Sequence, residues 1–480
     1  MRDPSCRRSW LAASCWSLVL PLVAQSPPLS VGPVFPHLTV MAPGAASDSE
    51  TGIGALVPWA DRLWAIGYVA HTRGEGIGLY EIDERLQMKL HPMSVTGTFA
   101  NRLVHWESKQ VFLGPHAIAA DGTVRNIEAL TRHRLTATAR HLRDPAGKVY
   151  MLTMEGLLFE VDVATLLCTQ LFDLTRELHL PTGAVPHFKG AHTAQGRLVV
   201  ANNTYDEREY LGHRRGGRLA EWAGGSWMIL EEEPFVEVAG KQNPTAGTAY
   251  GNTLFAVGWD RASVILRVLH AEQWSRYRLP KGSGSWDHAW TTEWMRIREA
   301  QTERYLMDAF GLFYELSPLV YGGRLQGVHP ICRHLRIVPD FCHWRGLLVL
   351  AGDQTDNAVG QPQSGLWLGE IDALWRFGKP TGEGAVWRDE RVLAGVPSDP
   401  MLMQGFDRTV LHLTNDGDRP VLVTIEVDVL GDGRFRRYGC YEVTGGGGYV
   451  HHEFPAGFAA RWVRLVSNGE TVLTGHFVFT

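Results

Sequence analysis

The chain has 480 residues and a formal net charge of −5, which is mild for its length. Without a strong positive charge, nucleic acid is not expected as the main partner. Hydrophobic residues make up 45% of the chain, enough for a large core, and its 52 glycines and 17 tryptophans are typical of a turn-rich all-β protein.

The first 24 residues have the pattern of an export signal. Three arginines precede an apolar stretch over 10–23, and a Pro/Ser segment follows Ala24. Because this stretch is short and is interrupted by serine and proline, we expect no stable membrane span. A signal peptide over 1–24 predicts a secreted or periplasmic protein, and an anchor that stays uncleaved is the alternative.

One short pattern recurs seven times along the chain: an apolar run with strand composition ends at a polar residue or glycine, and a second apolar run follows. The starts of successive first runs lie 39 to 56 residues apart, and these runs are 62–69, 109–114, 148–154, 197–202, 253–258, 304–308 and 347–352. A period in this range with strand composition predicts a β-propeller. We therefore expect a seven-bladed β-propeller over 50–380, with each first run as the innermost strand of a four-stranded antiparallel blade.

Beyond a Gly/Pro-rich bridge at 378–384 the rhythm of the sequence changes. Alternating apolar and polar residues predict strands separated by glycine-rich turns, and these strands are 409–413, 421–427, 461–466 and 476–479. We expect a small C-terminal antiparallel β-sandwich over 390–480. Its Asp-Gly clusters are typical of simple turns, and structural Ca²⁺ loops are the alternative.

Four cysteines follow the signal segment, and two of them, Cys332 and Cys342, are close enough in sequence for a disulfide. An exported protein permits such a bond, and a pair of buried free thiols is the alternative. No CxxC pair occurs in the sequence, so no zinc ribbon is predicted.

A propeller gathers polar residues at the two mouths of its central channel. Before the predicted inner strands we expect a cationic, aromatic and imidazole-bearing ring of Asn101, Arg102, Arg140, His141, Lys189, His192, Asn243, Trp294, Arg296, Arg298, Asp340 and His343. After these strands we expect a more acidic ring of His71, His116, Asn202, Asn203, Asp260, Asp308 and Asp353. Guanidinium groups suit a carboxylate, and imidazoles move protons near neutral pH. Hydrogen bonds between neighbouring blades are the alternative use of these side chains.

Short fragments in a consistent order on consecutive predicted blades carry a family resemblance. They are 56–59, 79–83, 91–92, 98–102, 139–142, 153–155, 195–197, 202–203, 292–294, 296–298 and 340–341. Over about residues 52–375 the chain resembles the seven-bladed propeller polysaccharide lyases, especially ulvan lyases and L-rhamnose-α-1,4-D-glucuronate lyases. The resemblance implies β-elimination at a rhamnose–glucuronate type linkage in a uronate-containing polysaccharide. The expected ligand is an acidic polysaccharide or oligosaccharide, the chemistry needs no cofactor, and we expect a monomer.

The resemblance also implies roles for particular residues. A histidine pair about twenty positions apart corresponds to His71 and His91, and Arg140 corresponds to an arginine that meets the uronate carboxylate. The tyrosine that partners the histidines in this family has no clear counterpart here, and His116 lies at a position comparable to that of the tyrosine. Metal ligands of some members are not kept around 285–288, which leaves the metal content open. Substrate contacts are expected from Asn101, Arg102, His141, His192, Asn203, Trp294 and Arg296.

In the implied reaction Arg140, with Arg102, neutralises the carboxylate and so acidifies the sugar C5 proton. His91 or His71 takes that proton, and the other histidine, or a nearby imidazole or phenol, protonates the leaving O4. One conflict remains, because the predicted strands place His71 and Arg140 at opposite mouths. A rhamnosidase-type glycoside hydrolase and a non-catalytic glycan-binding propeller are the alternative functions.

Overall fold

The computed structural model describes residues 51–69, 78–204, 216–241, 253–282, 294–301, 304–317, 320–321, 324–326, 328–334, 336–352 and 365–480. The predicted signal peptide, His71, Asn243, Asp353 and the segment 285–288 lie outside these residues. Over the described ranges the chain is almost entirely β, as the sequence predicts. No helix in them is long and apolar enough to cross a membrane.

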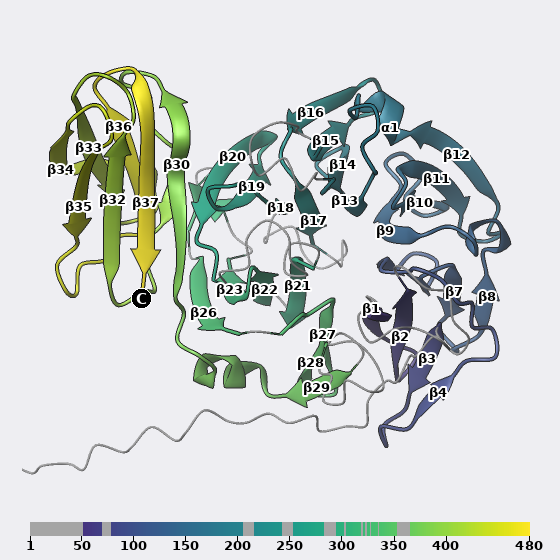
Figure 1. Cartoon of the computed structure of the whole chain (residues 1–480). Coiled ribbons are helices and arrows are strands. Elements are labelled where there is room, and N and C mark those ends of the chain that lie inside the picture. The colour runs from purple at the N-terminus through teal and green to yellow at the C-terminus, as the bar shows by residue number, and fades with distance from the viewer. Residues whose placement is uncertain are drawn as a thin grey trace, which may run out of the picture.

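Antiparallel sheets follow one another along the sequence and lie around a common centre (Figure 1). The first sheet contains β1 (Thr51–Trp59), β2 (Arg62–Val69), β3 (Leu79–Ile82) and β4 (Met88–Leu90). The second contains β5 (Arg102–His105), β6 (Gln110–Leu113), β7 (His116–Ala119) and β8 (Val124–Asn126). The third contains β9 (Leu135–Arg140), β10 (Lys148–Thr153), β11 (Leu157–Asp162) and β12 (Cys168–Asp173). The fourth contains β13 (Phe188–Ala194), β14 (Arg197–Asn202), β15 (Arg218–Trp222) and β16 (Trp227–Glu231).

The later sheets continue this order. The fifth sheet begins with β17 (Phe235–Gly240), β18 (Leu254–Trp259), β19 (Val264–His270) and β20 (Gln273–Leu279). The sixth contains β21 (Arg296–Gln301), β22 (Arg304–Ala309), β23 (Leu312–Leu316) and β26 (His329–Arg333). The seventh has, within the described residues, β27 (Phe341–Trp344), β28 (Leu347–Ala351) and β29 (Leu366–Gly369). Outside these sheets are the hairpin β24 (Val320–Tyr321) and β25 (Arg324–Leu325), and the short helical turns η1 (Glu128–Leu130), α1 (Leu174–Glu177) and η4 (Ile371–Arg376).

The innermost strand is the first one of each sheet. Around the centre these first strands neighbour one another in the order β1, β5, β9, β13, β17, β21 and β27, and β27 lies again beside β1 (Figure 1). The prediction that the apolar runs are innermost is therefore wrong by one strand, because those runs form second strands such as β6 and β28. A second strand is covered by the sheets on both sides, and all four residues of β6 are buried. An inner strand turns one edge to the centre and carries more polar residues, as in β21 (RIREAQ).

The last sheet of the ring contacts the first through apolar packing and polar contacts, such as the 2.7 Å hydrogen bond from Arg345 to Asp61. Ile53 and Leu63 of the first sheet share an apolar cluster with Val349 and Leu366 of the seventh. Burial of this cluster stabilises the ring, because it removes apolar surface from water where the two ends of the chain segment meet. Cys332 and Cys342 are both buried and unbonded, so the structure contains the free thiols that the sequence left as one of two alternatives.

The C-terminal residues form two further antiparallel sheets that share one core. One sheet has the order β30 (Gly382–Val392), β37 (Thr471–Phe479), β32 (Thr409–Asn415) and β35 (Gly448–Glu453). The other has the order β31 (Met401–Leu402), β36 (Trp462–Ser467), β33 (Val421–Asp428) and β34 (Arg436–Val443). The core between them includes Leu411, Ile425, Leu465 and Phe477. β30 begins inside the predicted bridge at 378–384, and its residues 384–387 are buried, with Val386 and Trp387 in this core.

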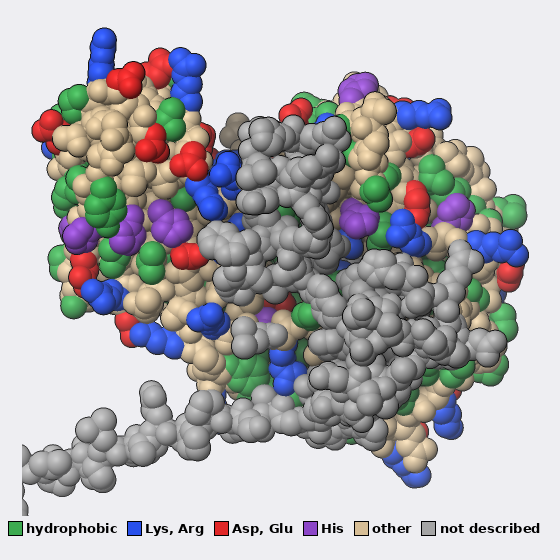
Figure 2. Space-filling model, in the orientation of Figure 1, with side chains coloured by type: hydrophobic (Ala, Val, Ile, Leu, Met, Phe, Trp, Pro, Cys, Tyr) green, Lys and Arg blue, Asp and Glu red, His purple; other side chains and the backbone are tan. Residues whose placement is uncertain are grey.

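On the described part of the face in Figure 2, acidic and basic side chains are interspersed, in keeping with the mild net charge. In the C-terminal part, the Asp428 carboxylate accepts the N–H groups of Gly431 and Gly433 at 2.8 and 2.7 Å. This Asp-Gly segment is therefore a hydrogen-bonded turn. No group of three metal-ligating side chains that could hold one ion occurs in the described ranges.

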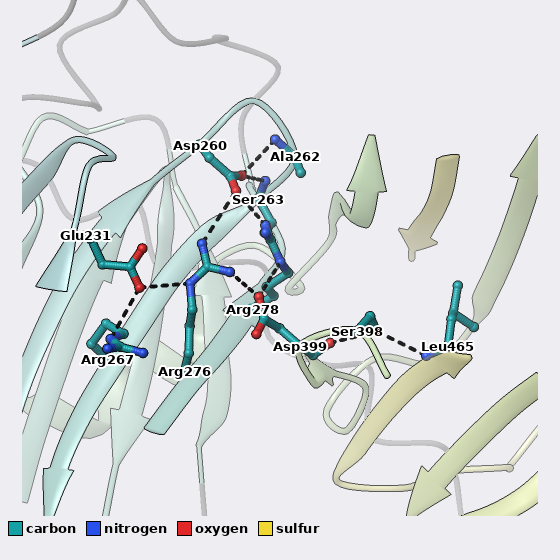
Figure 3. A network of polar contacts seen from close by, with 10 residues as sticks. All are labelled: Glu231, Asp260, Ala262, Ser263, Arg267, Arg276, Arg278, Ser398, Asp399 and Leu465. Atoms are coloured by element: carbon teal, nitrogen blue, oxygen red, sulfur yellow. Dashed lines mark hydrogen bonds and ion pairs between the residues drawn. The ribbon is translucent and has the colours of Figure 1, made fainter. Parts of the chain in front are cut away.

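A charged network joins the C-terminal sheets to the fifth sheet (Figure 3). Strand β31 pairs with β20 through Arg278 and Met401, which extends the fifth sheet into the C-terminal part. Beside this pairing, Asp399 accepts hydrogen bonds from Arg276 and, at 3.2 Å, from Arg278. Arg278 also donates to Asp260 at 2.8 Å. These contacts hold the C-terminal part against the edge of the ring.

Candidate functional site

Neighbouring inner strands run in the same direction around the ring. Phe99, just before β5, forms a parallel bridge with Leu135 at the start of β9. Near the ends of the strands, the Thr193 hydroxyl of β13 donates to the carbonyl of Arg140, the last residue of β9. The ring therefore has an N-terminal mouth, where inner strands begin, and a C-terminal mouth, where they end. Because antiparallel second strands run back, they end at the N-terminal mouth, and third strands begin there.

This strand direction brings much of the two predicted rings to one mouth. At or near the starts of inner strands, and hence at the N-terminal mouth, lie Asn101, Arg102, Lys189, Trp294, Arg296 and Asp340. His116 begins a third strand, Asn203 follows a second strand and His91 follows a fourth strand, so these three residues are at the same mouth. Residues of both predicted rings lie at one mouth because the apolar runs are second strands and not inner strands.

Arg140 and His141 lie instead at the C-terminal mouth, because β9 is an inner strand and ends at Arg140. Arg140 pairs with Glu107 there, with Nη1 donating to Oε2 at 2.8 Å. His141 Nε2 lies 2.9 Å from Glu160 Oε2. The expectation that Arg140 and His91 act on one sugar does not fit this placement, because the two residues stand at opposite mouths.

Five charged residues near the centre form the axial ion-pair network, which consists of Arg102, Glu237, Arg296, Arg298 and Asp340. Arg298 Nε donates to Asp340 Oδ1 at 2.7 Å, and its Nη1 donates to Glu237 Oε2 at 2.8 Å. Arg102 Nε lies 3.4 Å from Asp340 Oδ2, while Arg296 Nη1 lies 3.7 Å from Glu237 Oε2. The network joins the second, fifth, sixth and seventh sheets.

Burial and charge act against each other on Asp340, whose side chain is fully buried. Burial alone would raise the pKa of Asp340, but Arg102, Arg298 and the N–H group of Leu56 hold it below its ordinary value. The carboxylate is therefore ionised in the folded protein. Arg102 and Arg298 are engaged in contacts between sheets, which is the alternative use that the sequence left open for them.

His192 stands in the middle of inner strand β13. Desolvation by the surrounding protein lowers the pKa of His192 to about 4, with the charges of Arg140 and Arg298 acting in the same direction. Its imidazole is therefore neutral at pH 7. His192 therefore lies between the two mouths, beside the guanidinium groups of Arg140 and Arg298 rather than beside His91.

Two imidazoles lie near one another at the N-terminal mouth. His116 is fully buried, its Nδ1 is 2.7 Å from Asn126 Oδ1, and its Nε2 has no hydrogen-bond partner among the described residues. Burial lowers the pKa of His116 to about 4, with the hydrogen bond to Asn126 opposing this shift and the nearby His91 adding to it. The partly exposed His91 packs its ring 5.7 Å from that of Trp64, and its Nδ1 accepts the N–H of Met93 at 3.2 Å.

An aromatic and cationic cluster lies at the same mouth. The rings of Trp294 and Tyr68 meet edge to face with centroids 4.8 Å apart. The Lys189 ammonium and the Arg296 guanidinium lie 5.5 and 5.0 Å from the Trp294 ring. Cations over an aromatic face are attracted to its negative quadrupole. The cluster therefore concentrates positive charge beside a π-surface, which suits an anionic sugar.

Two buried asparagines, Asn101 and Asn203, also lie at this mouth. Asn101 donates to the Gly114 carbonyl at 3.0 Å and to the Thr138 hydroxyl at 2.8 Å, and its Oδ1 has no partner among the residues described. The N–H group of Asn203 donates to the His187 carbonyl at 3.0 Å. A cavity of about 10 Å³ beside Trp294 and Asp308 holds no more than one water. That cavity is too small for a sugar ring.

No protein-family model and no curated relative matches the chain. Among solved structures, the RRP9 WD40 repeats match with a TM-score of 0.42 at 10% identity, over 66% of this chain and 94% of that one. The extracellular domain of the putative hybrid two component system BT3049 from B. thetaiotaomicron matches with a TM-score of 0.40 at 11% identity, over 82% of this chain and 48% of that one. The computationally designed Ika8 protein matches with a TM-score of 0.34 at 12% identity, over 67% of this chain and 97% of that one.

Sequence reasoning missed several residues that build these surroundings, among them Glu107, Glu237 and Tyr68. Glu237 had a usable signal, because it is a lone carboxylate within the otherwise apolar run 235–240. A buried carboxylate needs a cationic partner, and Arg296 and Arg298 were already candidates. Tyr68 and Glu107 had no such signal, since each lies in a segment that reads as an ordinary strand or turn.

Proposed function

We propose that the chain is a secreted, seven-bladed β-propeller with a C-terminal β-sandwich, and that it is a polysaccharide lyase. Its substrate would be a uronate-containing polysaccharide with a rhamnose–glucuronate type linkage, cleaved by β-elimination at the N-terminal mouth. The sequence fragments shared with propeller lyases support the reaction class. The strand direction supports the location, because it puts His91, His116, Trp294 and Arg296 at one mouth.

The observation that carries the proposal is the pair His91 and His116. His91 is partly exposed, and its Nε2 has no hydrogen-bond partner among the described residues, so it can reach a sugar proton. His116 stays neutral because of burial, and its Nε2 is unpartnered in the described structure, so it is a second, fully buried imidazole near His91. Two imidazoles of different exposure in one place are suited to separate roles, with His91 in proton transfer and His116 in a supporting position.

In the proposed reaction, His91 takes the proton from C5 of the uronate. The C5–H electrons form the C4=C5 double bond, the C4–O4 bond breaks, and O4 receives a proton. His71, which the resemblance to propeller lyases pairs with His91, is the proposed donor of that proton. Lys189, which lies over the Trp294 ring, would neutralise the carboxylate in place of Arg140, which stands at the other mouth. Neutralising the carboxylate stabilises the charge that develops when C5 loses its proton.

A non-catalytic glycan-binding ring is the second candidate function, and one observation favours it. Arg102 and Arg298 are held by Asp340 and Glu237 in contacts between sheets, so fewer guanidinium groups are free for a substrate than the sequence predicted. Such a ring would bind the same acidic glycan at Trp294 without turning it over.

The two functions are separated by a turnover assay with the variant His91→Gln. We expect the parent protein to raise ultraviolet absorbance on a rhamnose-capped glucuronate polysaccharide, because the product is unsaturated. His91→Gln should lower this rate at least about 100-fold, the scale of a lost general base, with an unchanged melting temperature. The control is His270→Gln, at the end of β19, which should keep the parent rate. Equal rates for His91→Gln and the parent would contradict the role of His91, and a parent that binds without turnover would favour the second candidate.

A further inference from the structure

Three histidines form a row across the outer face of the C-terminal part. His476 of β37, His412 of β32 and His451 of β35 are register partners on three adjacent strands. Residues on either side of His412 are buried, so the row points away from the core. Figure 2 shows purple histidine side chains in a row across the outer face of the C-terminal part. We call His476, His412 and His451 the histidine row.

Two rings of the row, those of His412 and His451, are stacked on each other and on a tyrosine. The His412 and His451 centroids are 6.4 Å apart with a 28° angle between planes. Tyr449 stacks on His412 at 6.1 Å and 20°, and its hydroxyl lies 2.9 Å from His412 Nδ1. Tyr449 is 56% exposed. The row is therefore an accessible aromatic surface, and no contact in the described structure covers it.

Few carboxylates balance this row. Glu383 of β30 lies 3.6 Å from His476 Nε2, and Glu453 of β35 is held by Arg408 at 2.6 and 2.9 Å. Burial lowers the pKa of His476; Glu383 opposes this shift, while His412 and Arg388 reinforce it. When the three imidazoles bind protons, adjacent positive charges repel one another across neighbouring strands. An anion laid across the row would remove this repulsion.

We propose that the histidine row binds the carboxylate groups of an acidic polysaccharide, and that it binds them more tightly as the pH falls. The identity of the glycan rests on the proposed function, and the row would hold the polymer that the ring cleaves. Three points choose this occupant: the row places three imidazoles side by side, a uronate polymer is anionic, and Tyr449 offers an exposed stacking face. Thr414, two residues beyond His412 on the same face of β32, supplies a hydroxyl for a sugar.

Affinity electrophoresis of the full chain in gels that contain a glucuronate polysaccharide tests this proposal. We expect retention to be about five-fold stronger at about pH 5.5 than at about pH 7.5, because imidazoles gain charge over that range. A neutral galactan should give no retention at either pH. The triple variant His412→Gln, His451→Gln and His476→Gln should lose the pH dependence, whereas the control His270→Gln should keep it.

Three outcomes overturn the proposal. One is a triple variant that keeps the pH dependence of the parent. Another is retention that weakens in acid. The third is a parent that forms concentration-dependent dimers in acid without glycan, which would assign the row to a second copy of the chain.

The proposal and the proposed function fail separately. The triple variant should cleave short soluble oligosaccharides at the parent rate, because the row is not in the ring. A parent with pH-dependent retention but no turnover would contradict only the lyase proposal. A parent with turnover but no pH-dependent retention would contradict only the role of the row.

Discussion

Asp340 is the residue that joins the most partners near the centre of the ring. Its carboxylate accepts from the Leu56 backbone and from Arg298 and lies 3.4 Å from Arg102, so three sheets besides its own depend on one buried charge. Removing one partner of a buried ion pair leaves the other charge without compensation, which costs far more than losing an exposed pair. Asp340 is therefore expected to stabilise the ring rather than to touch substrate.

The variant Asp340→Asn should lower the free energy of unfolding by about 3 kcal/mol, because Arg102 and Arg298 would be left buried with less negative charge. Urea unfolding followed by tryptophan fluorescence measures this loss. The matched control is Asp372→Asn, whose carboxylate pairs with Arg304 while its side chain is 77% exposed, and which should cost less than about 1 kcal/mol. Equal effects of the two variants would contradict the role given to Asp340.

The same carboxylate predicts a pH dependence of stability. The pKa of Asp340 is lower in the folded protein than in the unfolded chain, so its contribution is present above the unfolded pKa and is lost as the pH falls through the folded pKa. The parent should therefore lose stability on acidification below about pH 4, and Asp340→Asn should lose less over that interval. Unfolding midpoints in urea at several acidic pH values test this, and parallel curves for the two proteins would contradict it.

At the scale of elements, the second strands of the ring sheets were predictable and the inner strands were not. Second strands such as β6 and β28 are covered on both faces, so they read as unbroken apolar runs. Inner strands such as β5 and β21 mix charged and apolar residues, because one side meets the centre, and they do not stand out from loops. This mixture explains the shift by one strand, and with it the misplacement of Arg140.

The element contact with the clearest consequence is that between β20 and β31. Asp399→Ala removes the acceptor that Arg276 and Arg278 share beside this pairing (Figure 3). We expect a loss of about 1–2 kcal/mol, since the carboxylate is partly exposed and Arg278 keeps Asp260. Trypsin should then cut several-fold faster after Arg376, between ring and C-terminal part. Glu470→Ala, which removes an exposed partner of Arg391, is the control and should leave the rate unchanged. A parent-like rate in Asp399→Ala would show that Asp399 does not hold the two parts together.

At the scale of the whole molecule, the sequence predicted an all-β chain of repeated four-stranded sheets, and the structure confirms this. It also predicted which residue types gather near the centre, because cations, amides and histidines recur at the boundaries of the apolar runs. It could not predict which mouth each residue occupies, since that depends on which strand is innermost. It could not predict the partners of Arg298 either, because Glu237 and Asp340 come from sheets on either side of it.

The measurement that tests the lyase proposal most directly is the mass of the products that the parent protein forms from a rhamnose-capped glucuronate oligosaccharide. If the protein is a lyase, we expect two products whose masses sum to that of the substrate, and one product should carry a C4=C5 double bond. Products whose masses sum to the substrate plus one water would contradict it, because hydrolysis and not elimination would then have broken the linkage. Intact substrate after prolonged incubation with folded protein would contradict it as well.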